Sequence, residues 1–309
     1  MYFKKERPSQ DPFLNFGKKR SIYRYFFLKG TSLNFDMYLA SGPNSYLGGL
    51  KFKNPAFFNG EIFSAYNGII EANAVYDRSG GVAFPPPKMD SKVLNCSAFK
   101  ILCNDKNLMY QYFGKFMPKS FEIKTATDLK VFLKKFSPAS LAVLKPANGL
   151  GGKNILIDKA SNLASAVLEK GMRYTLQEFI DTSRGITGLT TQTHDLRVVI
   201  VNGKIILSHL RTPKQGSLLA NAAQGGTLQE VPLEKIPANV LSIVSEMQKI
   251  IDKKFNFPIY SIDFGVTENG PLVFELNDQI GFPSEDMLNA KPFINALFES
   301  LVTLANVNC

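Results

Sequence analysis

Apolar and polar positions follow two different periods along the chain. Short apolar runs bounded by glycine, serine and asparagine are typical of buried strands, whereas apolar residues three and four apart are typical of helices. Strand or hairpin character is found at 23–28, 72–76, 141–158, 174–180, 195–211 and 259–277. Helical character is found at 104–116, 164–171, 234–254 and 291–306, and 121–136 combines a strand with a helix capped at Thr127. We therefore expect an α/β protein.

Local signals mark where several of these elements begin and turn. Asn202-Gly203 and Asn269-Gly270 are dipeptides that favour two-residue hairpin turns. We expect a helix to begin at Asp105-Lys106, because a side chain such as that of Asp105 can cap the first turn. Residues 1–20 mix lysine, arginine, proline and asparagine without an apolar period, which predicts a flexible basic arm.

Composition narrows the class of protein. The chain has 309 residues, 45% of them hydrophobic, which is enough for two or three folded domains of about 100–200 residues each. It has no long uncharged apolar run and no apolar stretch near its start, so we expect a soluble cytoplasmic protein without a membrane span. Three cysteines and two histidines at unrelated spacings argue against a disulfide framework or a zinc site.

The positive charge lies almost entirely in the first half of the chain. Residues 1–135 contain 21 Lys/Arg against 10 Asp/Glu, and residues 136–309 contain 15 against 16. A field of this kind attracts an acidic partner, although scattered lysines that only keep the surface soluble are an equal alternative.

The last hairpin brings acidic side chains together. Glu275 and Asn277 alternate onto one face of a strand, and the hairpin places Asp263 opposite them within a residue or two. Two carboxylates and an amide oxygen on one face suit a hard cation such as magnesium or manganese. The alternative is an ordinary solvated outer face, which alternation alone would also produce.

Two further segments carry positive side chains that suit phosphate. Lys145 ends a strand just before a glycine-rich loop, 148–153, and the amides of such a loop can approach phosphate oxygens. The loop residues concerned are Gly149, Gly151, Gly152 and Lys153. Arg197 and Arg211 lie at the same open end of a hairpin, with Asn221 on the next loop, and could hold phosphate or carboxylate. Taken alone, the loop could be a plain turn and the arginines a surface pair.

The order of these motifs resembles the ATP-grasp superfamily. The motifs are Asp105-Lys106, LKPANGLGGKN, LQEFI, DLRVVIVNGKI, the Arg, Asn and Gly-Gly stretch of 211–226, and IDFGV with FELN, preceded by YDRSG. The similarity covers about residues 70–285. It points to the branch of ribosomal-protein glutamate ligases, glutathione-synthetase-like enzymes and peptide-modifying ligases. The resemblance implies a pre-ATP-grasp α/β domain at 21–100 after the arm at 1–20, a small lobe at 101–182 and a large lobe at 183–309.

The resemblance also implies roles for individual residues. Lys106 and Lys145 would hold ATP phosphates while the loop 148–153 closes over them. The residues expected to border adenine or ribose are Gln177, Glu178, Phe179, Ile180 and Asp181. Arg197 and Arg211 would stabilise the transferring phosphoryl group. Two magnesium ions, with manganese as the alternative, would lie on Asp263, Glu275 and Asn277, beside Asn221.

The implied reaction joins a carboxylate to an amine through an acyl-phosphate, releasing ADP and phosphate. The basic first half favours an acidic peptide or a small polycarboxylate as substrate. The loop 278–283 departs from the family pattern, so the substrate itself cannot be carried over. Two alternatives stay open, an ATP-grasp kinase acting on a hydroxyl and a non-catalytic binding module; nucleic acid is a less favoured partner, and a homo-oligomer is left open.

Overall fold

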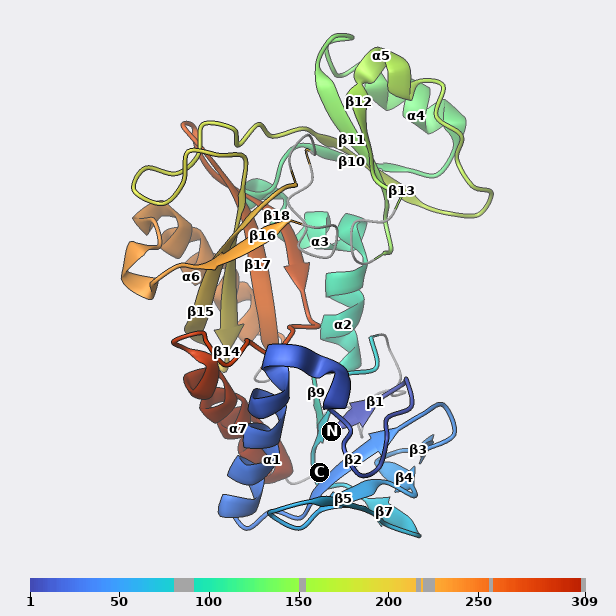
Figure 1. Cartoon of the computed structure of the whole chain (residues 1–309). Helices are drawn as coiled ribbons and strands as arrows, with labels where there is room; N and C mark the ends of the chain where they lie inside the picture. The colour runs from blue at the N-terminus through green and yellow to red at the C-terminus, as the bar shows by residue number, and fades with distance from the viewer. Residues whose placement is uncertain (81–91, 150–153, 215–217, 219–225, 256–257, 307–309) are drawn as a thin grey trace.

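The computed structural model describes residues 1–80, 92–149, 154–214, 218, 226–255 and 258–306. Figure 1 shows three parts in a column, with the N-terminal unit at the bottom, a five-stranded sheet in the middle and a four-stranded sheet at the top right. None of the helices in these ranges is both long and apolar enough to cross a membrane.

The N-terminal unit combines short strands with one long helix. Its four-stranded sheet has the order β1-β2-β5-β6, formed by Tyr2–Phe3, Met37–Ser41, Ala56–Phe58 and Phe63–Ala65. A second sheet has the order β3-β4-β7, formed by Tyr46–Gly48, Lys51–Lys53 and Ile69–Glu71. Strands β8 (Val75–Tyr76) and β9 (Val93–Leu94) pair in parallel. Helix α1 (Arg20–Ser32) follows the 3-10 segment η1 (Leu14–Lys19).

The four-stranded sheet at the top has the order β10-β13-β11-β12. Its strands are β10 (Ser120–Ile123), β11 (Leu141–Pro146), β12 (Leu156–Lys159) and β13 (Tyr174–Glu178). Two helices, α4 (Ala126–Leu133) and α5 (Ala160–Leu163), pack against one face. Two more, α2 (Ser97–Asn104) and α3 (Lys106–Phe113), connect this sheet to the rest of the molecule (Figure 1).

The five-stranded sheet has the order β16-β15-β14-β17-β18. Its strands are β14 (Asp195–Val201), β15 (Lys204–Thr212), β16 (Thr227–Glu230), β17 (Ile259–Thr267) and β18 (Gly270–Asn277). All neighbours are antiparallel, as the two predicted hairpins require. The remaining helical elements are η3 (Gly114–Phe116), η5 (Leu233–Lys235), α6 (Ala238–Asp252) and α7 (Ala290–Asn306).

Alternate residues of β14 face opposite sides of the five-stranded sheet. Val198 and Ile200 are buried in one core with α6, whereas Val199 and Val201 are buried in another core with α1, α7 and the N-terminal unit. Arg197 continues the second face, at the end that no apolar cluster of the described residues covers. Apolar packing therefore covers only part of this face and leaves the rest to polar side chains.

Several expectations for the first third of the chain are wrong. Residues 23–28 belong to helix α1, because the buried positions around Tyr23 and Phe27 recur with helical spacing. The expected flexible arm is instead ordered: Tyr2 pairs with Ala40, and Phe13 is buried against Tyr23. Helix α2 was not anticipated at all.

Three other expectations need smaller corrections. Helix α4 is capped by Thr125 rather than Thr127, since the Thr125 hydroxyl accepts from the Asp128 amide and the Asp128 carboxylate accepts from the Thr125 amide. Helix α5 ends at Leu163 and 164–171 is not helical, because Val167 is 92% exposed and contributes no apolar face. The last hairpin turns one residue early, with Thr267 opposite Gly270.

Candidate active site

Polar side chains gather where the uncovered face of the five-stranded sheet meets the four-stranded lobe. Antiparallel register places Arg197 opposite His209 on one side and opposite Asp263 on the other. A bulge after Asp263 shifts the next pairing, so that Asp263 lies directly opposite Glu275. The predicted convergence of these side chains across neighbouring strands is therefore present.

Two arginines and two aspartates form a buried ionic network. The Arg197 guanidinium donates from Nε and one terminal nitrogen to the two oxygens of Asp263, both at 2.6 Å. Arg211 makes the equivalent fork to Asp195 at 2.5 and 2.6 Å, and donates to Asp263 at 2.7 Å. These four side chains are between 5% and 19% exposed. When both carboxyls are ionised, the four charges cancel, as partly buried charges require.

The network shifts the pKa of its members in different directions. Burial opposes ionisation of Asp263, but the two guanidiniums outweigh it and hold the pKa of that carboxyl well below its usual range. Burial and the charge of Asp263 raise the pKa of Asp195 to about 7, against the pull of Arg211. Burial and the arginines lower the pKa of His209 to about 3, so its ring is neutral. The two carboxyls thus have different pKa values, because the positive neighbours dominate at Asp263 and desolvation dominates at Asp195.

Sequence reasoning missed Asp195 and His209. Both could have been found, since Asp195 lies two residues before Arg197 and His209 two before Arg211, so each shares a face with its arginine.

The oxygen ligands proposed for a cation lie together. Asn277 donates from Nδ2 to Asp263 at 3.1 Å, and the Glu275 carboxylate, 28% exposed, lies 3.6 Å from the Lys106 ammonium. In the described ranges, no group of three or more His, Cys, Asp and Glu side chains gathers for a metal. Two carboxylates with an amide oxygen nevertheless fit a magnesium-type ion whose other ligands are phosphates. Such an ion would share the Asp263 oxygens with the arginines.

The lysines reach the site from the opposite lobe. Lys145, on β11, donates to the side-chain Oε1 of Gln177 at 2.8 Å, and the side-chain Nε2 of Gln177 donates to the Ser120 hydroxyl at 2.9 Å. Burial lowers the pKa of Lys145 to about 8, with Glu275 opposing the shift. The Gln177 side chain therefore binds Lys145. This contact differs from the role that the family resemblance implies for Gln177, which is to border adenine.

Lys106 occupies the first position of α3, as the sequence predicts. Its ammonium donates to the Gly149 carbonyl at 2.9 Å, and its backbone amide donates to the Ala147 carbonyl at 3.0 Å. The Asp105 side chain accepts from the amides of Asn107 and Leu108, at 3.0 and 3.1 Å, which is the expected N-cap. Lys106 is thus held where the helix and the start of the glycine-rich loop meet.

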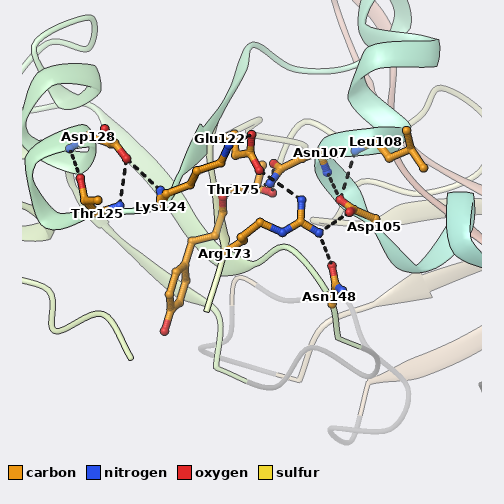
Figure 2. Close-up of polar contacts among 11 residues, drawn as sticks. Asp105, Asn107, Leu108, Glu122, Lys124, Thr125, Asp128, Asn148, Arg173 and Thr175 are labelled. Atoms are coloured by element: carbon orange, nitrogen blue, oxygen red, sulfur yellow. Dashed lines mark hydrogen bonds and ion pairs between the residues drawn. The ribbon is translucent and has the colours of Figure 1, made fainter. Parts of the chain in front are cut away.

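Figure 2 shows what fastens this helix to the four-stranded lobe. Arg173 forms an ion pair with Asp105 and a second with Glu122 at 3.1 Å, and it donates to Asn148 at 3.5 Å. The guanidinium therefore connects the cap of α3, strand β10 and the chain entering the glycine-rich loop. Charge-assisted contacts of this kind fix relative positions more firmly than neutral ones.

One cavity of about 380 Å³ collects most of the predicted residues. Its predicted lining residues are Lys106, Lys145, Gly149, Gln177, Glu178, Phe179, Ile180, Arg197, Arg211, Asp263, Glu275 and Asn277. Its apolar walls include Val143, Ile155, Ile157 and Phe274, which sequence reasoning did not single out. Asp181 is not part of the lining; it is exposed and accepts from the Ser183 amide. Gly151, Gly152, Lys153 and Asn221 lie outside the described residues.

Comparison with solved structures identifies the fold. D-alanyl-alanine synthetase A from Vibrio cholerae superposes with a TM-score of 0.61 over 98% of this chain and 97% of that one, at 11% identity. A RimK-domain ATP-grasp protein from Sphaerobacter thermophilus superposes with a TM-score of 0.58 over 98% of both chains, at 13% identity. The protein has the ATP-grasp fold, which confirms the expected α/β fold class.

Sequence comparison narrows the resemblance. Residues 106–254 match the model described as the ATP-grasp domain of prokaryotic glutathione synthetase. A probable alpha-L-glutamate ligase of Maridesulfovibrio salexigens is 29% identical over 143 residues, 45% of this chain and 42% of the relative. Another, of Vibrio parahaemolyticus, is 24% identical over 172 residues, 54% of this chain and 52% of the relative. The chain thus spans about half the length of the curated relatives it matches, and the resemblance to ATP-grasp proteins is confirmed.

Proposed function

We propose that this protein is an ATP-dependent ligase that joins a carboxylate to an amine through an acyl-phosphate. One observation carries the proposal: Lys106 and Lys145 reach one cavity from the side of the four-stranded lobe, and Arg197, Arg211 and an acidic cluster reach it from the five-stranded sheet. Positive groups that surround a charged reaction centre, with no protein nucleophile, suit phosphoryl transfer.

Each part of the cavity has a separate task in this proposal. The walls formed by Val143, Ile157 and Phe274 receive the adenine ring, beside the chain at Glu178 and Phe179. The two lysine ammoniums hold phosphate oxygens. Gln177 serves mainly to orient Lys145, because both ends of its amide are already bonded.

The arginine pair faces the transferring group. Arg197 and Arg211 are pre-organised by forked contacts with Asp263 and Asp195, so no side-chain ordering is needed when charge develops. Asp263, Glu275 and Asn277 would hold two magnesium ions, with manganese as a substitute. When bound, these ions would neutralise charge on the phosphates.

The proposed reaction has two steps, and each step balances. A substrate carboxylate oxygen attacks the terminal phosphorus of ATP, and ADP leaves. The amine then attacks the acyl carbon, the acyl–phosphate bond breaks, phosphate leaves with the proton that the nitrogen loses, and an amide remains. A polycarboxylate or an acidic peptide is the proposed acid, because the first half of the chain is strongly basic.

Hydroxylamine provides the test. Because it replaces the amine, an activated acid accumulates as a hydroxamate whichever amine is natural. The protein is incubated with ATP, magnesium and a panel of carboxylic acids, and hydroxamate and ADP are measured. Equal amounts of both are expected with at least one acid. ADP formed with a phosphorylated hydroxyl and no hydroxamate would instead identify a kinase.

A further inference from the structure

Two positive side chains and one neutral histidine lie next to the candidate active site, where the N-terminal unit begins to cover the same sheet face. We call Lys19, Arg78 and His209 the boundary cluster. Lys19 and Arg78 come from the N-terminal unit, and both lie against the chain just after β18, the strand that carries Glu275 and Asn277. His209 lies on the sheet beside Arg197.

Arg78 is held in place but has unused bonding capacity. It donates to the Ile280 carbonyl at 2.7 Å and lies over the Tyr76 ring, with its carbon 5.5 Å from the ring centre. Its Nε is buried without a hydrogen-bond partner in the part of the chain that the structure describes. A buried donor without a partner costs free energy unless a ligand or water satisfies it.

Lys19 differs from both of its neighbours. Lys18 pairs with Asp286 at 2.7 Å and Arg20 pairs with Asp11 at 2.5 Å, whereas no ion pair of Lys19 is found among the described residues. Its ammonium lies 3.3 Å from where a Cβ on Gly281 would be, so it points at the chain that follows β18. Lys19 is exposed as a whole, but desolvation of its ammonium and the charge of Arg78 both lower its pKa.

His209 connects the cluster to the arginines of the active site. Its Nδ1 is buried and, within the described ranges, has no partner. Arg197, Arg211 and Lys19 all act on this ring electrostatically, and Asp263 opposes them. A neutral imidazole between cations can donate to an incoming anion without adding charge.

The acidic groups nearby do not cancel this positive charge. Asp77 is fully engaged in a buried ion pair with Lys100. Asp278 accepts from the Gln279 side chain and acts electrostatically on both Lys100 and Arg78, so it offsets at most one positive charge of the cluster. Asp195 and Asp263 are already committed to the two arginines. The boundary cluster therefore keeps a net positive charge, and His209, opposite Arg197 in the sheet, joins it to the candidate active site.

We propose that the boundary cluster binds a second anionic group of the acid substrate, one that is not itself phosphorylated. The substrate class is then an acid with two negative groups, such as an amino diacid or a peptide with an acidic residue. The inference rests on the proposed function and deepens it. Lys19 would supply the charge, Arg78 the directed donors and His209 a neutral donor towards the arginines.

Paired probes test this assignment. L-glutamate and L-glutamine, with L-aspartate and L-asparagine, are nearly equal in shape but differ by one negative charge. In the hydroxamate assay, the wild-type protein should prefer the charged member of a pair at least about tenfold in kcat/KM. Lys19→Met should remove most of this preference by raising KM for the charged acid, with less than about a twofold change for its amide.

Lys18→Met is the matched control, because Lys18 is adjacent, 71% exposed in its side chain and paired on the surface. It should leave both KM values unchanged. Hydroxamate formed without preference for the charged acid, or an equal loss with both acids in Lys19→Met, would overturn the subsite and leave the ligase proposal intact. No hydroxamate with any acid would overturn the ligase proposal and the subsite with it.

Discussion

Glu275 and Asp263 offer a way to separate catalysis from stability at the same site. The Glu275 side chain is 28% exposed, and its ion-pair partner Lys106 is 3.6 Å away. Glu275→Gln should therefore cost less than about 1 kcal/mol in the free energy of unfolding. Asp263 is 5% exposed and accepts from Arg197, Arg211 and Asn277. Asp263→Asn leaves two guanidiniums short of negative charge and should cost about 3 kcal/mol.

Both variants should lose turnover for the same reason. Each removes a carboxylate proposed to hold magnesium near the phosphates, where charge is least replaceable. Urea unfolding followed by circular dichroism would measure stability, and calorimetric binding of a non-hydrolysable ATP analogue with and without magnesium would measure the site directly. Hydroxamate formation would report catalysis.

Two results would refute the reasoning. If Glu275→Gln keeps more than about a tenth of the wild-type rate, the loss in barrier is under ~1.4 kcal/mol and Glu275 does not hold a catalytic ion. If Asp263→Asn unfolds at the same urea concentration as the wild type, the ionic network does not contribute to stability as its burial implies.

Three further outcomes are expected. Because the Lys145 pKa is lowered to about 8, this side chain loses its proton as pH rises through that value, so KM for ATP measured from pH 7 to 9.5 should rise above pH 8. Lys145→Met should bind ATP weakly and show no such rise. A wild-type KM for ATP that stays constant over this range would contradict the prediction. Arg173→Gln should raise KM for ATP about threefold or more, because it removes the ion pair that holds Asp105, the N-cap of α3. Arg184→Gln should leave KM for ATP unchanged, because the ion pair of Arg184 with Glu268 is exposed. An equal rise in KM in both variants would contradict a positioning role for Arg173. Raising the salt concentration from 0.1 to 1 M shortens the screening length from ~10 to ~3 Å, so KM for the acid should rise more than KM for ATP. If KM for the acid does not change with salt, the positive charge of the first half does not attract the acid and serves only solubility.

Local features of the sequence were sufficient where neighbouring residues decide the outcome. The Asn202-Gly203 turn has both residues at positive φ, which sets the β14-β15 register up to the bulge between Val199 and Ile200. Likewise, alternation in β18 puts Glu275 and Asn277 on one face, since a side-chain period of two follows from strand geometry, whereas the bulge after Asp263 brings that residue to the same face.

Local features failed where the same residues fit two structures. The aromatic run at 23–28 satisfies a buried strand as well as the apolar face of α1, and only packing against α7 and Phe282 selects the helix. Residues 2 and 3 form a strand because residues 40 and 41 pair with them, a partner that no local pattern announces.

The sequence by itself determined which chemical groups the protein carries and, through turn and strand periodicity, which of them share a face. Only the tertiary structure decided which of their charges are cancelled: Asp263 meets Arg197 across 66 positions, and Lys145 meets Gln177 across 32. Burial and the field of such distant neighbours set each pKa, and among the described residues they leave Lys19 and Arg78 without an ion pair at the edge of the site. Neither the burial of a side chain nor its pKa can be obtained from residue order alone, because both depend on which side chains the fold brings within a few ångströms of one another.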